Sequence, residues 1–320
     1  MRTRTSETYR RFADIEARGV SAVYEEWASG IADDDQVLQL LDTLPRGKRQ
    51  PNLVFAAARS LGAEGSYDQL HAWVLERWPD LARVVLLRAT QTNEAARCAV
   101  LLPLISAIEG PVALIEVGAS AGLCLHPDRY SYRFDVGDRV VALDPVDGPS
   151  DVVLSLRVEP EDVPSRLPQV VWRAGIDLDP VDLSDEDQVA WLEALVWPEH
   201  HDRRARLRRA ADVAAREPVT MVRGDLVVEL RGLVDRAPRG AHVVVFHSAV
   251  LVYLSPEDRQ AFVDLVQALP DVTWISNEGA GVFPWMAELL DVPVDGRTLL
   301  ARDGVPHALV GSHGQSFQRL

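Results

Sequence analysis

Residues 114–123, LIEVGASAGL, decide the fold expected for this chain. They continue a short apolar run over 112–117 whose β-branched residues are typical of a strand buried on both faces. The run holds an acid, Glu116, near its end and leads into a turn that contains Gly118 and Gly122. Glycine lets the backbone turn sharply and lets a ligand approach closely. Because open α/β sheets bind ligands at the carboxyl ends of their strands, this turn is the first candidate site.

Apolar runs and helical patterns alternate after residue 110. The further strands are expected at 169–177, 219–225, 241–248 and 271–277, and the helices at 185–215, 226–235 and 256–269. This alternation predicts an α/β fold, with a doubly wound, mostly parallel, Rossmann-like sheet. Two runs around Asp303 and Gly304 predict a C-terminal antiparallel hairpin. The proline-rich residues 127–168 interrupt the alternation and are expected to form an irregular insertion with short strands.

The N-terminal third of the chain shows helical spacing of apolar residues instead. Pro51 marks one helix start, and Ser66 with Gln69 forms a capping-box pattern at another. A long helical stretch is expected over about 80–108, interrupted in composition by the polar residues 91–94. We therefore expect two domains, a helical N-terminal cap over 1–109 and an α/β domain over 110–320.

Composition narrows the classes of function. Of the 320 residues, 47% are hydrophobic and 25% are charged, as in soluble globular proteins. The net charge of −15 argues against nucleic acid or an anionic membrane as the main partner. Two cysteines, Cys98 and Cys124, without a CxxC pair argue against a disulfide framework or a cysteine zinc site, and no metal is expected. The sequence shows neither a secretory h-region nor a membrane-length apolar run, so we expect a cytoplasmic protein. The expected partner is a small-molecule substrate. The oligomeric state stays open.

The turn after the first strand has the pattern E-x-G-x-S-x-G. It resembles the first motif of class I S-adenosylmethionine-dependent methyltransferases, commonly written D/E-x-G-x-G-x-G, with Ser120 in place of the middle glycine. The dinucleotide fingerprint fits less well, and a phosphate loop is absent from the sequence. The resemblance implies that Glu116, Gly118, Ser120 and Gly122 hold S-adenosylmethionine. A purely structural turn is the alternative interpretation.

Two later aspartates are implied by the same resemblance. In these methyltransferases an acid at the end of the second strand holds the ribose hydroxyls, and Asp177 matches it. A carboxylate suits that task because it accepts two hydroxyl hydrogen bonds. Asp135 is closer in sequence to Glu116 and is the competing candidate, but we favour Asp177 because the insertion absorbs the longer interval. Gly224 and Asp225 resemble the third-strand element that contacts the adenine amino group.

The ends of the fourth and fifth strands carry the residues expected at the reaction centre. His247 stands where the methyltransferases usually have an aspartate, and it is our candidate general base because its ordinary pKa of about 6.5 is closest to working pH. A histidine buried at a strand end without a catalytic role is the alternative. Glu278 is expected to share a proton with His247, and Ser248 and Asn277 to bind polar groups of the substrate.

Two segments outside these elements also carry polar or charged side chains. Asn93 and Glu94 are polar residues in an apolar helical region, where an added helix in methyltransferases often covers the methionine end of the cofactor; they are candidate substrate-binding residues. A helix N-terminus or a solvated face is the alternative for both. The segment 197–201 contains adjacent histidines followed by an arginine run. Adjacent helical side chains diverge by about 100°, so we expect no joint metal site and a mostly solvated face.

Taken together, the sequence resembles a family known as domain of unknown function 2332, found chiefly in actinobacteria. The resemblance is carried by residues 91–98, 116–122, 172–177, 191–199, 224–225 and 245–247. It implies a methyltransferase-like fold. Pro127 departs from that fold, because proline inside a helix costs about 3 kcal/mol and the helix after the first motif is therefore expected to be short or kinked.

The function expected from these observations is an S-adenosylmethionine-dependent methyltransferase acting on a small molecule. One alternative is a non-catalytic ligand-binding protein on a degenerate methyltransferase scaffold. The other is an enzyme that uses a different nucleoside cofactor together with His247.

Overall fold

The computed structural model describes residues 4–320, which form two compact units. One unit contains residues up to Thr92 together with Asp185–Ala205, and the other contains Asn93–Ser184 and Arg206–Leu320. The helical unit therefore ends earlier than residue 109 and includes a segment from the second half of the chain. Within the described residues, no helix is long and apolar enough to span a membrane.

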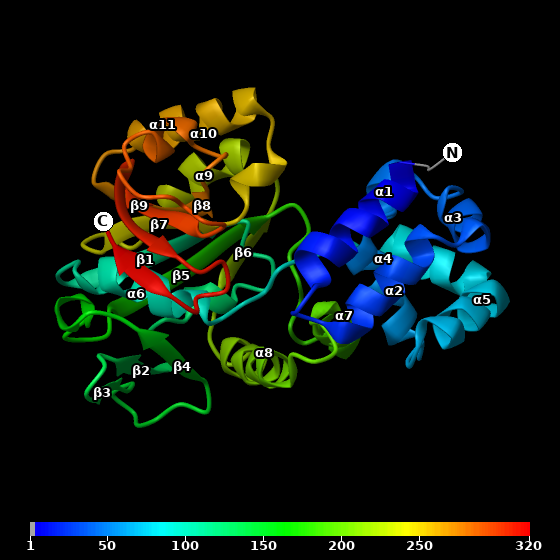
Figure 1. Ribbon diagram of the computed structural model, residues 1–320. Coiled ribbons are helices and arrows are strands. Elements are labelled where there is room, and N and C mark those ends of the chain that lie inside the picture. The colour runs from blue at the N-terminus through cyan, green and yellow to red at the C-terminus, as the bar shows by residue number, and fades with distance from the viewer. Residues whose placement is uncertain (1–3) are drawn as a thin grey trace. The chain divides into compact units, whose positions relative to one another are not determined.

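The first unit is made of helices, as the apolar spacing predicts (Figure 1). They are α1 (Arg4–Arg11), a π-helix (Phe12–Ala17), α2 (Ala22–Ala32), α3 (Asp35–Leu41), α4 (Pro51–Ser60), α5 (Tyr67–Leu87) and α7 (Glu186–Leu195), with a 3₁₀ turn at Arg46–Lys48. Ser66 and Gln69 form the expected capping box at the start of α5. The core is aromatic, with the ring centroids of Trp27 and Phe55 5.5 Å apart. Trp197 packs against this core, and its Nε1 donates a hydrogen bond to Asn52 Oδ1, so its role is structural.

The second unit is built on an eight-stranded sheet with the order β11-β10-β9-β8-β7-β1-β5-β6. The strands are β1 (Pro111–Val117), β5 (Gln169–Asp177), β6 (Thr220–Arg223), β7 (His242–Ser248), β8 (Val272–Gly279), β9 (Thr298–Arg302), β10 (Val305–Val310) and β11 (Phe317–Arg319). The first five of these run parallel, and β9 joins β8 antiparallel. The predicted α/β class with a mostly parallel sheet is therefore confirmed. In order of appearance, the parallel strands follow the 3-2-1-4-5 arrangement of doubly wound sheets.

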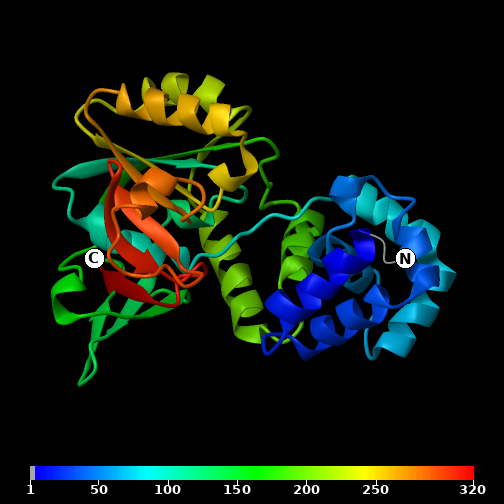
Figure 2. The same ribbon diagram turned by 45° about the horizontal axis from the view of Figure 1, so that its top comes forward.

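Helices cover both faces of this sheet (Figures 1 and 2). The helices of this unit are α6 (Arg97–Ser106), α9 (Leu226–Val234), α10 (Pro256–Gln267) and α11 (Pro284–Ala287), with short 3₁₀ turns at Leu123–Leu125, Pro160–Asp162 and Leu251–Tyr253. Helix α8 (His201–Ala214) begins in the first unit and continues into the second. Helices α9 and α10 lie on one face, and α6 lies on the other. The C-terminal hairpin of β9 and β10 agrees with the expectation, with Asp303 at φ 51° and Gly304 at φ 80° in its turn.

The insertion forms a small separate sheet. Its strands β2 (Ser131–Asp135), β3 (Val140–Leu143) and β4 (Val153–Arg157) pair in the order β3-β2-β4. Between β1 and this sheet the chain forms only the 3₁₀ turn at Leu123–Leu125, which His126 and then Pro127 follow. The strand-to-helix unit that usually follows the first glycine turn is therefore reduced to a single turn.

Two predicted helices were wrong in their length. The stretch over 80–108 is two helices, because α5 ends at Leu87, α6 begins at Arg97 and the chain between them is not helical. The stretch over 185–215 breaks between α7 and α8, where Pro198 disfavours helical geometry. In the first case the Asn93 side chain binds the β1 turn, and the chain around it does not continue a helix.

Alternation along the strands fixes which side chains share a face. Ile115 and Val117 of β1 and Val245 of β7 belong to the core that packs under α9 and α10. Successive side chains of a strand point to opposite faces. Glu116, which lies between the two β1 core residues, therefore points to the α6 face.

Candidate functional site

The topological switch point of the sheet lies between β1 and β7. From β1 the chain adds β5 and β6 on one side, and then β7 and β8 on the other. Ligands of doubly wound sheets bind at the carboxyl ends of the strands at this point. The elements that meet there are the turn of residues 118–122, which we call the β1 turn, the ends of β5 and β7, and the segment before α6.

The β1 turn is held on the end of β5 by backbone hydrogen bonds. Gly118 N and Ala119 N both donate to the carbonyl oxygen of Ile176, at 2.8 and 3.0 Å. Gly118 and Gly122 adopt φ +71° and +68°, values that glycine tolerates far better than other residues. Ser120 also has a positive φ of 49°. The turn is therefore a tight structure that the two glycines make possible.

Asp177 lies against this turn, at the end of the second parallel strand. Its Oδ2 accepts the Ser120 N–H at 2.8 Å, and its Oδ1 accepts the Asp179 N–H at 2.8 Å. Each carboxylate oxygen has a second lone pair for a further donor. Asp135 instead ends β2 in the separate small sheet, where it is exposed and accepts the N–H of Gly137. Of the two candidate acids, the structure brings Asp177 to the turn.

Asn93 is buried and binds the same turn from its other side. Its Nδ2 donates to Ser120 Oγ at 2.9 Å, and its Oδ1 accepts the Ala121 N–H at 3.0 Å. Glu94 is buried beside it, and its Oε1 accepts from Ala96 N at 3.0 Å and from Arg206 Nε at 2.9 Å. These two residues therefore do not form a solvated face. Asn93 attaches the segment before α6 to the turn, whereas Glu94 binds the N-cap residue of α6 and Arg206.

Packing accounts for the glycine at position 118. A Cβ on Gly118 would lie 2.4 Å from Val250 Cγ2, so the Val250 side chain fills the space beside it. A Cβ on Gly122 would be 3.2 Å from Leu125 Cδ1. The side of Gly118 that faces Val250 is therefore occupied by protein. The contact between Gly118 and a cofactor stays a prediction.

The third-strand element lies next to Asp177. Gly224 N donates to the Asp177 carbonyl oxygen at 3.0 Å. Asp225 is the N-cap of α9, because its Oδ1 accepts from Val227 N at 2.8 Å and from Val228 N at 3.3 Å. Its carboxylate is exposed and keeps acceptor capacity beyond this cap.

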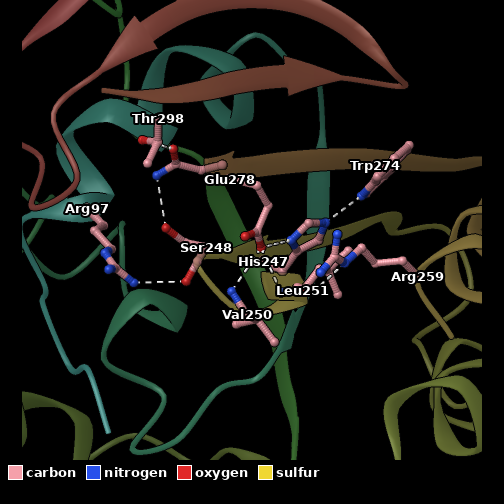
Figure 3. Close-up of polar contacts among 10 residues, drawn as sticks. Arg97, His247, Ser248, Val250, Leu251, Arg259, Trp274, Glu278 and Thr298 are labelled. Carbon is pink, nitrogen blue, oxygen red and sulfur yellow. Dashed lines mark hydrogen bonds and ion pairs between the residues drawn. The ribbon is translucent and has the colours of Figure 1, made fainter. Parts of the chain in front are cut away.

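His247 lies on the α10 face of the sheet, within the core (Figure 3). Trp274 Nε1 donates to His247 Nε2 at 2.9 Å, so the ring proton is on Nδ1, which contacts Glu278 Oε1 at 2.7 Å. The ring also packs edge-on against Phe262. His247 is 0% exposed. With both ring nitrogens occupied inside the core, this histidine is not placed to take a proton from a substrate.

Glu278 connects His247 to the loop after β7. Its Oε1 also accepts the backbone N–H groups of Val250 at 2.9 Å and Leu251 at 3.1 Å. The same loop supplies the Val250 side chain that covers Gly118. The histidine and the glutamate thus position the β7 loop beside the β1 turn, and the geometry favours the non-catalytic interpretation of this pair.

The other residues at these strand ends point to the opposite face. Asn277 Nδ2 donates to Ser248 Oγ at 2.9 Å, and Thr298 Oγ1 donates to Asn277 Oδ1 at 2.6 Å. Arg97 Nη1 donates to the Ser248 carbonyl oxygen at 2.9 Å (Figure 3). Because neighbours in a strand alternate, Ser248 and Asn277 cannot share one site with His247 and Glu278. The expected single cluster is therefore two clusters, one on each face.

Glu116 points to the α6 face, where Arg97 at the start of α6 acts on it electrostatically. Glu116 is 7% exposed, and its Oε2 has no hydrogen-bond partner. Burial raises the pKa of Glu116 well above its usual range, and the charges of Cys124 and Asp177 raise it further, while Arg97 lowers it. Sequence reasoning missed Arg97 as a site residue. The available signal was a charged residue at the start of the apolar helix 97–106.

Comparison with known proteins identifies the family but not a reaction. A family described as an uncharacterized protein conserved in bacteria, DUF2332, matches residues 6–319. Searches of curated proteins and of solved structures found no match. Among residues 4–320, no group of three or more His, Cys, Asp or Glu side chains is arranged to hold a metal ion. Because the match covers nearly the whole chain, the protein belongs to the DUF2332 family.

Proposed function

We propose that this protein is an S-adenosylmethionine-dependent methyltransferase that acts on a small molecule. The observation that carries the proposal is the placement of the Asp177 carboxylate at the carboxyl end of β5, 2.8 Å from the Ser120 N–H of the β1 turn. An acid at the end of the second strand, facing the turn of the first, suits a ligand that contains a ribose.

The chemistry of the available groups fits an adenosine. Asp177 has a lone pair on each oxygen for the ribose hydroxyls, and the exposed carboxylate of Asp225 has acceptor capacity for the adenine amino group. Glu116 Oε2 is buried without a hydrogen-bond partner, so it offers a further polar group to a ligand. Bound S-adenosylmethionine would supply a methyl group that the acceptor's lone pair attacks while the carbon–sulfur bond breaks. The chain's own residues would bind and align the reactants, and alignment supplies much of the acceleration of such a displacement.

His247 and Glu278 are not carried into this proposal as catalytic groups. They are buried in the α10 face and hold the β7 loop. The proposal therefore assigns no protein base, and it favours acceptors whose nucleophilic atom carries no proton at neutral pH. The same observation favours a second candidate function, a binding protein on this scaffold that transfers no methyl group.

Calorimetry with S-adenosylhomocysteine, the demethylated product, tests the proposal. We expect binding by the wild type, and an affinity about 10- to 100-fold weaker in Asp177→Asn, because a charged acceptor of hydrogen bonds is lost. Asp135→Asn is the matched control, since Asp135 is the competing acid on the other sheet, and its affinity is expected to equal that of the wild type.

Three results would separate the candidates. An absence of binding at millimolar ligand rejects the methyltransferase, as does an equal effect of the two aspartate substitutions. Binding without product formation across a broad panel of acceptors favours the binding protein. Thermal unfolding of each variant, followed by circular dichroism, checks that Asp177→Asn keeps the fold despite its altered bond to Ser120.

A further inference from the structure

Arg97 is a buried cation at the start of α6. Its side chain is 6% exposed, and it makes no ion pair with any carboxylate of residues 4–320. Its described hydrogen bonds go to two backbone carbonyls, those of Ser248 at 2.9 Å from Nη1 and Ser312 at 3.1 Å from Nε. A guanidinium has five N–H donors, so these bonds leave donor capacity unused. Burying a charge without a counter-charge is costly.

The neighbouring acids do not neutralise this cation. Glu94 pairs with Arg206, at 2.9 Å from Oε1 to Nε. Asp177 accepts the backbone N–H of Ser120 in the β1 turn and that of Asp179 just after β5. Glu116 is the acid on which Arg97 acts electrostatically, and burial raises the pKa of Glu116. Among the described contacts, no hydrogen bond or ion pair joins the two side chains, and Glu116 Oε2 has no partner.

The two side chains lie at the carboxyl edge where a ligand is expected. Glu116 is next to the last residue of β1, and Arg97 opens α6 and binds the end of β7, so both flank the switch point. Glu116 Oε2 is buried and has no partner. Two polar groups that are each more than nine-tenths buried, one cationic and one with an orphaned oxygen, therefore occur at the same edge of the sheet.

We propose that Arg97 and Glu116 form a subsite for the carboxylate group of a small molecule. A single buried cation balances the single charge of a carboxylate, whereas a phosphate dianion would keep an uncompensated charge. A guanidinium also matches the planar geometry of a carboxylate. The inference rests on the proposed function and deepens it. The carboxylate belongs either to the amino-acid end of the cofactor or to the methyl acceptor.

Two nucleosides separate the first source from the second. S-adenosylhomocysteine carries the amino-acid carboxylate, and 5′-methylthioadenosine lacks it. If the subsite holds this group, Arg97→Gln weakens S-adenosylhomocysteine binding by about 10- to 100-fold and leaves methylthioadenosine binding unchanged, as expected for the loss of a charge-assisted hydrogen bond. If Arg97→Gln weakens the binding of both nucleosides equally, Arg97 only supports the local structure of the nucleoside site, and the inference is overturned.

Benzoate, titrated with methylthioadenosine present, tests the acceptor as the source. A subsite for an acceptor carboxylate predicts benzoate binding by the wild type that Arg97→Gln weakens by a similar factor, with S-adenosylhomocysteine binding unaffected. If Arg97→Gln changes neither ligand, the inference is overturned even though the nucleoside binds. If the wild type binds neither nucleoside, the proposed function fails, and benzoate alone then decides the carboxylate subsite by binding to the wild type more tightly than to the variant.

Arg166→Gln is the matched control for these titrations. Arg166 also donates to two backbone carbonyls, those of Ser106 and Ile108, but at the opposite end of β1. Its substitution is expected to leave every affinity unchanged. Arg97→Lys, which keeps the charge and loses the planar fork, is expected to fall between the wild type and Arg97→Gln.

Discussion

Replacing His247 with leucine distinguishes a structural histidine from a catalytic one. Leucine leaves the buried Trp274 N–H without an acceptor, which costs about 1–3 kcal/mol, and removes one of the three donors to Glu278, which costs about 1.5–3 kcal/mol. We therefore expect His247→Leu to lower the free energy of opening of β7 and β8 by about 3–5 kcal/mol. His242→Leu is the matched control, because His242 begins the same strand, is half-buried and has one described partner, Thr273 Oγ1 at 2.8 Å. Its expected cost is about 1 kcal/mol.

Amide hydrogen exchange, read by mass spectrometry on peptides that cover β7 and β8, measures this effect locally. It suits a chain of two compact units, for which a single global unfolding free energy is poorly defined. We expect exchange in these peptides to become more than about 100-fold faster in His247→Leu, and about 5-fold faster in His242→Leu. The reasoning is refuted if both variants exchange alike while only His247→Leu loses catalytic turnover. That result would support a catalytic role for His247.

Three further substitutions or treatments follow from the packing and from the buried titratable groups. Gly118→Ala should lower the melting temperature, because its Cβ would lie 2.4 Å from Val250 Cγ2 and because a φ of +71° costs alanine about 1–2 kcal/mol. The double variant with Val250→Ala should recover only the part of this loss that is due to the clash. Full recovery of the melting temperature would contradict the cost assigned to the positive φ. Burial raises the pKa of Glu116 above its ordinary value of 4.5, so above that pH the unfolded chain releases a proton that the folded chain keeps, and wild-type stability should fall as pH rises toward the folded-state pKa. Glu116→Gln should lack this loss, so its melting temperature relative to the wild type should be higher at pH 8 than at pH 5, and the reverse trend would contradict the burial of this carboxyl. Cys98 and Cys124 are both buried, and burial raises the pKa of the Cys98 thiol. A disulfide reagent at pH 8 should therefore label the native protein slowly and should label two thiols after denaturation. Rapid labelling of the native protein would contradict this expectation.

The sequence predicted the central sheet well because its strands are defined by local composition. Apolar runs such as 112–117 and 241–248 became buried parallel strands, and the Asp303-Gly304 pair formed the hairpin turn that its backbone preference favours. The break between α5 and α6 escaped this reasoning. It depends on Asn93, whose side chain binds Ser120 and Ala121 in a turn that lies later in the chain.

The division of the site between two faces was the part that sequence motifs did not predict. His247 and Ser248 are adjacent, as are Asn277 and Glu278, and a list of strand-end residues places all four together. Alternation sends His247 and Glu278 to the α10 face, where Trp274 and Phe262 surround the ring. The strand period alone gives this split, but the identity of the buried face requires knowledge of which helix covers it. Arg97 was missed because its hydrogen-bond partners, the carbonyl groups of Ser248 and Ser312, are distant from it in sequence.

A crystal structure of the protein with S-adenosylhomocysteine tests the central claim most directly. The account predicts electron density for the adenosine at the carboxyl ends of β1 and β5, with the ribose hydroxyls within hydrogen-bond distance of Asp177. Density for the nucleoside elsewhere, or an unchanged β1 turn without ligand at saturating concentration, would contradict it.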